Sequence, residues 1–254
     1  MSWFAYLVAV ILGLVTGSFL NVVIYRVPRN ISVVKPRSFC PRCGARIRWF
    51  ENVPLASYLC LRGRCRTCGN RIPARYPLVE ASGAALACVA VFAFGPTIDA
   101  VFAFAFFMAL MAITLIDWDF KIIPDGLSIP FIGIGLCWSL FHPGLTLVSS
   151  ALGALVGGGG IYAIGALYKI ARKTEGMGGG DVKLMAMIGA FVGLRLLVPV
   201  ILIASLAGTI YGCSLLRSGK GAKTAVAFGS FLSPAAAFSL LFGERLLSWY
   251  FRGF

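Results

Sequence analysis

The sequence predicts an all-α polytopic membrane protein with about eight transmembrane helices and a small, cytoplasmic, zinc-ribbon-like insert. Of its 254 residues, 59% are hydrophobic and only 13% are charged, whereas soluble globular domains carry about 25% charged residues. The apolar residues form long runs instead of alternating with polar ones, which indicates that a bilayer surrounds them. A single long polar stretch near the N-terminus interrupts these runs.

Positive charge is concentrated in that polar stretch. The formal net charge is +14, and twelve of the 23 lysines and arginines lie between Arg26 and Arg75. Loops rich in basic residues face the cytoplasm in membrane proteins, so we expect the stretch to be cytoplasmic. Anionic phospholipids are the expected counterions for this charge, and no nucleic-acid partner is expected.

The first apolar run, Trp3 to Tyr25, predicts a transmembrane helix over residues 1–25. The run has no basic residue before it and no small-x-small cleavage site after it, which argues against a secretory signal. Arg26 and Arg29 follow the run, so the N-terminus is expected to be periplasmic.

Seven further apolar runs follow the polar stretch: Leu78–Gly95, Ala100–Ile116, Leu127–Phe141, Leu145–Ile170, Val182–Gly193, Leu196–Leu216 and Thr224–Tyr250. Alternating them from a cytoplasmic Arg26 gives eight spans and a periplasmic C-terminus. The connections that then face the cytoplasm carry most of the remaining basic residues, which supports this arrangement. The run Val182–Gly193 is the shortest, and alone it cannot cross a hydrocarbon core of about 30 Å.

Glycines recur within the later runs, at Gly157 to Gly160 and in the pair Gly189 and Gly193. Small residues at such spacing are typical of closely packed transmembrane helices. We prefer this interpretation to a phosphate-binding loop.

Four cysteines of the polar stretch form two CxxC pairs, Cys40 with Cys43 and Cys65 with Cys68. Two such pairs can place four thiolates around one zinc ion, and stable disulfides are not expected in the cytoplasm. Closed four-thiolate sites are usually structural, so we expect the metal to support the fold of the insert. Unmetallated thiols or a redox pair remain the alternative.

Two of the nine acidic residues stand where apolar runs meet the cytoplasmic face. Asp117 directly follows the run Ala100–Ile116, and Asp181 directly precedes Val182–Gly193. An ionisable side chain at membrane depth is costly and indicates function, and two carboxylates brought together can act as base and acid toward a peptide carbonyl. An aspartate at a helix start can equally be an N-cap, an alternative that stays open for Asp181. Asp125 is interpreted as a cap.

The order of these motifs resembles that of the type IV prepilin peptidases. The resemblance covers nearly the whole chain, and its last segment contains the GxGD motif shared with preflagellin peptidases and the presenilin group of membrane aspartyl proteases. The matching segments are Gly17-Ser-Phe-Leu-Asn21-Val-Val-Ile-Tyr-Arg26-Val-Pro28, the two CxxC pairs, Asn52-Val-Pro54-Leu-Ala-Ser57-Tyr58, Leu61-Arg-Gly63-Arg64-Cys65, Arg75-Tyr76-Pro77-Leu-Val-Glu80, Ile116-Asp117 with Pro124-Asp125, and Gly178-x-Gly180-Asp181-Val-Lys183-Leu.

The resemblance implies a bifunctional enzyme of the bacterial inner membrane. Such an enzyme removes the short basic leader of type IV prepilins or type II secretion pseudopilins and N-methylates the new N-terminus. The resemblance implies that Asp117 and Asp181 form the catalytic pair, supported by the motif residues Gly178, Gly180 and Lys183. S-adenosylmethionine is the implied methyl donor.

The same resemblance implies that the two activities belong to different segments of the chain. Residues 26–77 are the methyltransferase-associated insert, with Gly63 and Glu80 at motif positions near it, and residues 78–254 are the peptidase domain. One departure is Ala227-Phe228-Gly229-Ser230, where the family often has Pro-Phe-Gly-Pro. The alternative from another class is a zinc-stabilised transporter that couples to protons or cations. A transporter predicts carboxylates near mid-membrane and often internal repeats, and the sequence displays neither.

Overall fold

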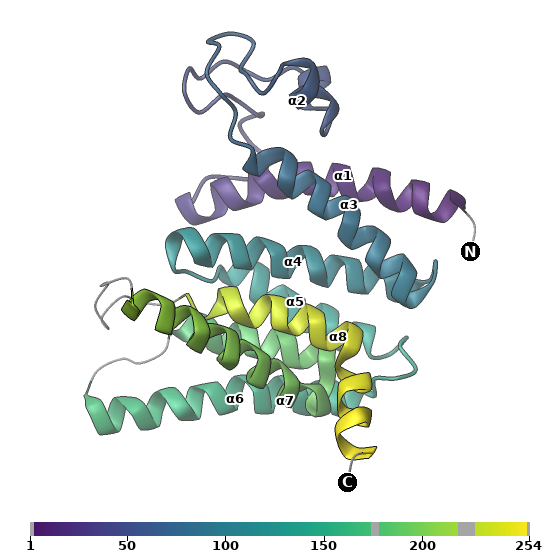
Figure 1. The fold of residues 1–254 in the computed structure, drawn as a ribbon, viewed down its shortest axis with the longest axis vertical. Helices are drawn as coiled ribbons and strands as arrows, with labels where there is room; N and C mark the ends of the chain where they lie inside the picture. The colour runs from purple at the N-terminus through teal and green to yellow at the C-terminus, as the bar shows by residue number, and fades with distance from the viewer. Residues whose placement is uncertain (1–2, 174–177, 218–226, 253–254) are drawn as a thin grey trace. The chain divides into compact units, whose positions relative to one another are not determined.

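The computed structural model describes residues 3–173, 178–217 and 227–252, and within these ranges the chain forms helices and no β-strand (Figure 1). The elements are α1 (Trp3–Arg26), the 3-10 helices η1 (Val27–Arg29) and η2 (Trp49–Asn52), α2 (Ala56–Cys60), α3 (Arg75–Phe94), α4 (Ile98–Phe120), α5 (Asp125–Trp138), α6 (Leu147–Arg172), α7 (Gly179–Arg217) and α8 (Gly229–Arg252). The predicted all-α architecture is therefore confirmed.

Five of these helices, α1, α3, α4, α6 and α7, are long and apolar enough to cross a membrane. Large apolar side chains are exposed along them, for example Leu155 at 71% and Leu206 at 65%. Such exposure suits lipid, in which helices satisfy their own backbone hydrogen bonds. The protein is a multi-pass membrane protein.

The eight predicted apolar runs each fall on a helical stretch. The two runs on either side of Gly193 both belong to α7, whose backbone leaves helical geometry at that glycine, with φ 71° and ψ 175°. This conformation is strained for residues with a side chain, and it separates the short predicted run from the next one. Residues 224–226, the start of the last predicted run, lie outside the described residues.

The chain divides into two compact units, residues 1–108 and residues 109–254. In the N-terminal unit, α1 packs on α3 through glycines. A Cβ on Gly13 would overlap the backbone of Ala84, and one on Gly17 would lie 2.8 Å from Cα of Glu80. The polar insert connects these two helices and contains η1, η2 and α2.

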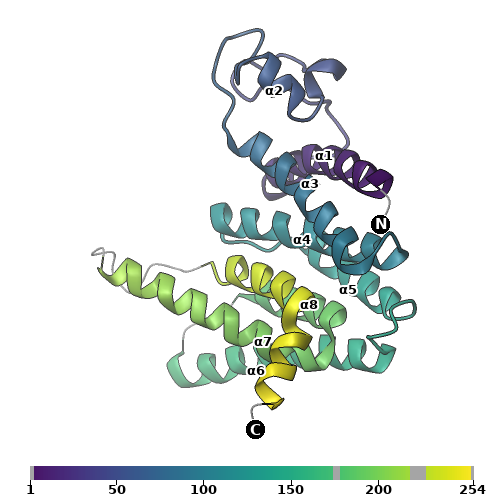
Figure 2. The same cartoon turned by 45° about the vertical axis from the view of Figure 1, so that its right-hand side comes forward.

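In the C-terminal unit, α7 packs against α5, α6 and α8, and Figures 1 and 2 both show α6 running beside α7. The predicted close packing through small residues is confirmed here. A Cβ on Gly189 would overlap the carbonyl of Gly153, and one on Gly157 would lie 2.7 Å from the carbonyl oxygen of Met185. Gly159 and Gly160 face open space instead.

Candidate active site and metal centre

Asp117 is a buried carboxylic acid near the C-terminal end of α4, with 5% of its surface exposed. Its Oδ2 accepts a 2.9 Å hydrogen bond from the backbone N–H of Ser230, at the start of α8. The Ser230 hydroxyl lies 3.2 Å from the same oxygen and 3.1 Å from the Thr114 carbonyl oxygen. A buried carboxyl group without such donors would be strongly unfavourable, so Ser230 holds Asp117 in place.

Asp181 lies in the first turn of α7 and is half-buried. Its backbone N–H donates to the Gly178 carbonyl at 3.1 Å, and its carboxylate is close enough to Asp117 for the two charges to interact. The C-terminal unit thus brings together the two predicted aspartates from two different helices.

Ile123 lies beside both carboxylate-bearing segments. A Cβ on Gly180 would approach Cβ of Ile123 at 2.9 Å, and a Cβ on Gly229 would meet Cδ1 of Ile123 at 2.9 Å and Oδ2 of Asp117 at 3.0 Å. These two glycines therefore allow the start of α7 and the start of α8 to approach Ile123 closely. The other motif glycine, Gly178, has space around it.

The interpretation of Asp125 as a helix cap was wrong. Asp125 is the first residue of α5, which has Pro124 at its N-cap position and no side-chain cap. Both carboxylate oxygens instead accept from Nζ of Lys183, at 2.7 Å. This ion pair connects the start of α5 to the first turn of α7, which gives the motif residue Lys183 a physical role.

The four cysteines of the insert converge as predicted. One sulfur from each of Cys40, Cys43, Cys65 and Cys68 lies within 4.8 Å of every other. Sulfurs about 2.3 Å from a tetrahedral zinc ion would lie roughly 3.8 Å apart, so the four sulfurs are close enough together to share one ion. Cys60 is not part of the cluster.

The two cysteine pairs lie on two backbone turns of the same kind. Gly44 N–H donates to the Cys40 carbonyl and Gly69 N–H to the Cys65 carbonyl, both at 2.9 Å, and both glycines have a positive φ near 70°. Backbone and side-chain hydrogen bonds from Asn70 lower the pKa of the Cys68 thiol to about 6. A thiolate at neutral pH is the form that binds metal, and this donor set suits zinc.

Gly63 and Glu80 both contribute to the surroundings of the insert. Gly63 is buried with φ +65°, and a Cβ there would lie 2.9 Å from the hydroxyl of Tyr58. Glu80, on α3, accepts a 2.8 Å hydrogen bond from the backbone N–H of Leu55. Gly63 thus allows the ring of Tyr58 to approach the backbone of the insert. Glu80 holds the insert through the backbone amide of Leu55.

Ser230 and Ile123 were not identified as site residues from the sequence. Ser230 is the last residue of the segment that departs from the family pattern, which is the only sequence signal that pointed to it. Its hydrogen bond to Asp117 joins helices far apart in the chain, so local pattern could not reveal it.

Two family models match the chain. The bacterial peptidase A24 N-terminal domain matches residues 11–94, and the type IV leader peptidase family matches residues 104–213. A prepilin leader peptidase/N-methyltransferase of Burkholderia pseudomallei is 39% identical over 92% of this chain and 84% of its own length. One of Pseudomonas aeruginosa is 37% identical over 98% of this chain and 94% of its own length.

No solved structure is significantly similar to the chain. These two relatives align over nearly the whole chain at 39% and 37% identity. The protein therefore belongs to the type IV leader peptidase family.

Proposed function

We propose that this protein is a membrane aspartic endopeptidase and N-methyltransferase that matures type IV prepilins or type II secretion pseudopilins. The observation that carries the proposal is the convergence of Asp117 and Asp181, from two helices, on the surroundings of Ile123, close enough for their charges to interact. Relatives that are 39% and 37% identical to this chain are named prepilin leader peptidase/N-methyltransferase. Both carboxylates lie close to helix ends, where a substrate at the membrane surface can reach them.

The pair can hydrolyse a peptide bond without a covalent intermediate. One carboxylate removes a proton from water while the other, as a carboxylic acid, donates a proton to the scissile carbonyl oxygen. The resulting tetrahedral diol collapses as a proton passes to the leaving nitrogen, and the C–N bond breaks. Ser230 fixes the orientation of Asp117 during these transfers, through its two donors.

The distribution of charge along the chain indicates how the substrate lies relative to the two faces of the membrane. The insert is cytoplasmic, because it carries the concentration of basic residues, and the N-terminus is periplasmic. The hydrophobic helix of the prepilin lies in the inner membrane and presents its leader junction at the cytoplasmic face. Anionic phospholipids lie against the basic loops, and nucleic acid has no role.

Methylation belongs to the insert, residues 26–77, and cleavage to residues 78–254. S-adenosylmethionine supplies the methyl group to the new N-terminal amine. A zinc ion held by Cys40, Cys43, Cys65 and Cys68 stabilises the insert, which has few apolar residues of its own and gains folding free energy from the metal. Four thiolates leave no open coordination position, so the metal has no chemical role.

The test is cleavage of a model prepilin by the purified protein in detergent. Asp117→Asn and Asp181→Asn each remove one proton-transfer group, so each should reduce cleavage by about a thousandfold or more. Asp119→Asn is the matched control, because Asp119 is exposed two residues from Asp117. Substantial cleavage by either active-site variant, at normal membrane insertion, would remove that aspartate from the mechanism.

A further inference from the structure

Two adjoining cavities lie beside the insert, within the N-terminal unit. The smaller has a volume of about 110 Å³ and the larger about 290 Å³. The larger is of the size that small-molecule ligands occupy, roughly 300 Å³ and above. The cavities share six lining residues, namely Phe39, Pro41, Ile47, Asn52, Tyr76 and Glu80.

The smaller cavity contains a buried cation without an anionic partner. Arg26 is only 4% exposed, and its guanidinium donates to the carbonyls of Ser32 at 2.9 Å and Arg37 at 3.4 Å. Within the described part of the chain, Arg26 forms no ion pair. A buried charge is costly unless an opposite charge compensates it, so the geometry favours an anionic group in this cavity.

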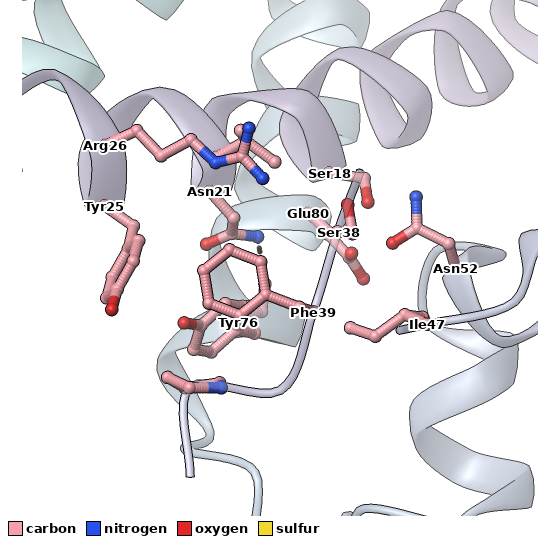
Figure 3. Close-up of a pocket in the computed structure, with 12 residues that line it drawn as sticks. Ser18, Asn21, Tyr25, Arg26, Ser38, Phe39, Ile47, Asn52, Tyr76 and Glu80 are labelled. Atoms are coloured by element: carbon pink, nitrogen blue, oxygen red, sulfur yellow. Dashed lines mark hydrogen bonds between the residues drawn. The ribbon is translucent and has the colours of Figure 1, made fainter. Parts of the chain in front are cut away.

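Glu80 provides the opposite charge. Its Oε2 accepts from Leu55 N–H, and among the residues described here it has no basic partner. This is unusual in a chain with 23 lysines and arginines and only nine acidic residues. Figure 3 shows Asn21 between Arg26 and the rings of Phe39 and Tyr76, with Glu80 to the right of them in this view.

We propose that these joined cavities are the binding site of the methyl donor, S-adenosylmethionine, an inference that rests on the proposed methyltransferase activity. Arg26 binds the α-carboxylate of the donor, and Glu80 faces its cationic ammonium or sulfonium group. The aromatic side chains of Phe39, Tyr58 and Tyr76 provide faces for the adenine ring and for the sulfonium. A zwitterion needs a cation and an anion to face it, and Arg26 and Glu80 both line the smaller cavity.

The reaction at this site is a direct methyl transfer. The lone pair of the neutral N-terminal amine attacks the methyl carbon, and the carbon–sulfur bond breaks with its electron pair returning to sulfur. The sulfonium becomes a neutral thioether, and the methylated ammonium loses a proton to water. A carboxylate that paired with the sulfonium loses its partner at this step, which favours release of the product.

The experiment measures binding of tritiated S-adenosylmethionine to the purified full-length protein in detergent. Arg26→Gln and Glu80→Gln should each weaken binding by about tenfold to a hundredfold, the usual loss for one hydrogen bond to a charged group. Lys35→Gln is the matched control, because Lys35 is an exposed basic residue of the same insert that lines neither cavity.

A second measurement needs no variant. Decarboxylated S-adenosylmethionine, which lacks the group assigned to Arg26, should compete at least tenfold more weakly with the unmodified protein. In Arg26→Gln, the two compounds should bind equally well. Equal binding of both compounds to the unmodified protein, or donor binding by Arg26→Gln equal to that of Lys35→Gln, would overturn the assignment.

The methyltransferase activity and the assigned donor site can be tested separately. If the unmodified protein methylates cleaved prepilin but both variants bind the donor normally, the donor site lies elsewhere and the methyltransferase activity stands. If it cleaves prepilin but neither methylates it nor binds the donor, the proposed methyltransferase activity fails together with the site. Displacement of the tritiated donor by vesicles of phosphatidylethanolamine, another zwitterion, but not by S-adenosylhomocysteine would identify the cavities as a lipid site and overturn the proposal.

Discussion

The backbone N–H of Ser230 donates a 2.9 Å hydrogen bond to Oδ2 of Asp117, a residue 113 positions earlier in the chain. The Ser230 hydroxyl lies 3.2 Å from the same oxygen. Two donors on one carboxylate oxygen fix the direction in which the other oxygen points. The start of α8 therefore positions a proposed catalytic group of α4.

The first prediction concerns the Ser230 hydroxyl. Ser230→Ala keeps the backbone donor and removes the hydroxyl, so kcat/KM for leader cleavage should fall about tenfold, corresponding to roughly 1.4 kcal/mol. Ser233→Ala is the matched control on the same helix, because the Ser233 hydroxyl is buried and has no hydrogen-bond partner among the described residues. Removing that hydroxyl should leave cleavage unchanged. Equal rates for the two variants would show that the Ser230 hydroxyl does not position Asp117.

The second prediction concerns the glycines that precede Asp181. In Gly180→Ala the new Cβ would lie 2.9 Å from Cβ of Ile123, an atom fixed close to the backbone. Either α7 or Ile123 must move, and a displacement of the carboxylate by about 1 Å can cost on the order of a hundredfold in rate. In Gly179→Ala the new Cβ would have no atom of the described residues within 4 Å, and this variant should cleave at the normal rate. Both rates come from the same prepilin assay, and a normal rate for Gly180→Ala would contradict the close approach to Ile123.

The third prediction concerns helix packing away from the site. Gly189→Ala would drive a methyl group into the backbone of Gly153, so it should destabilise the protein by roughly 1–3 kcal/mol. Gly159→Ala has open space and gains helix propensity, so it should be neutral or stabilising. Thermal unfolding in detergent measures both. A melting temperature for Gly189→Ala at or above that of Gly159→Ala would show that α6 and α7 do not depend on this contact.

Much of the fold could be predicted because its signals are local. A run of apolar residues long enough to cross a bilayer predicts a helix wherever it occurs, and a CxxC pair predicts the local turn that directs two sulfurs to one point. The non-helical backbone at Gly193 coincides with the end of the predicted run Val182–Gly193. These features do not depend on which segments become neighbours.

The rest depends on contacts between distant segments. Asp125 stands at a helix start, where a cap is the local expectation, but its carboxylate instead accepts hydrogen bonds from Nζ of Lys183, 58 residues later. The cavity beside the insert combines Arg26 from α1 with Glu80 from α3, and no spacing in the sequence relates them. The role of Ser230 could not be predicted for the same reason, because only the tertiary structure brings it within hydrogen-bond distance of Asp117.

The last prediction concerns the cysteine cluster. The purified protein should contain about one zinc ion, and Cys40→Ser combined with Cys43→Ser should lose it, because two thiolates cannot close a tetrahedral site. All four cysteines belong to one contiguous insert, whereas Asp117 and Asp181 lie in the other compact unit.

Loss of the metal should therefore damage methylation more than proteolysis. The double variant should still cleave prepilin and leave the new N-terminus largely unmethylated, as mass spectrometry of the product would show. A protein in which Cys60→Ser is the only change is the control, because this exposed thiol lies outside the cluster, and it should keep both the zinc and the methylation. Equal loss of cleavage and methylation in the double variant would mean that the insert also orders the peptidase site, because folding free energy supplied by the metal would then support both activities.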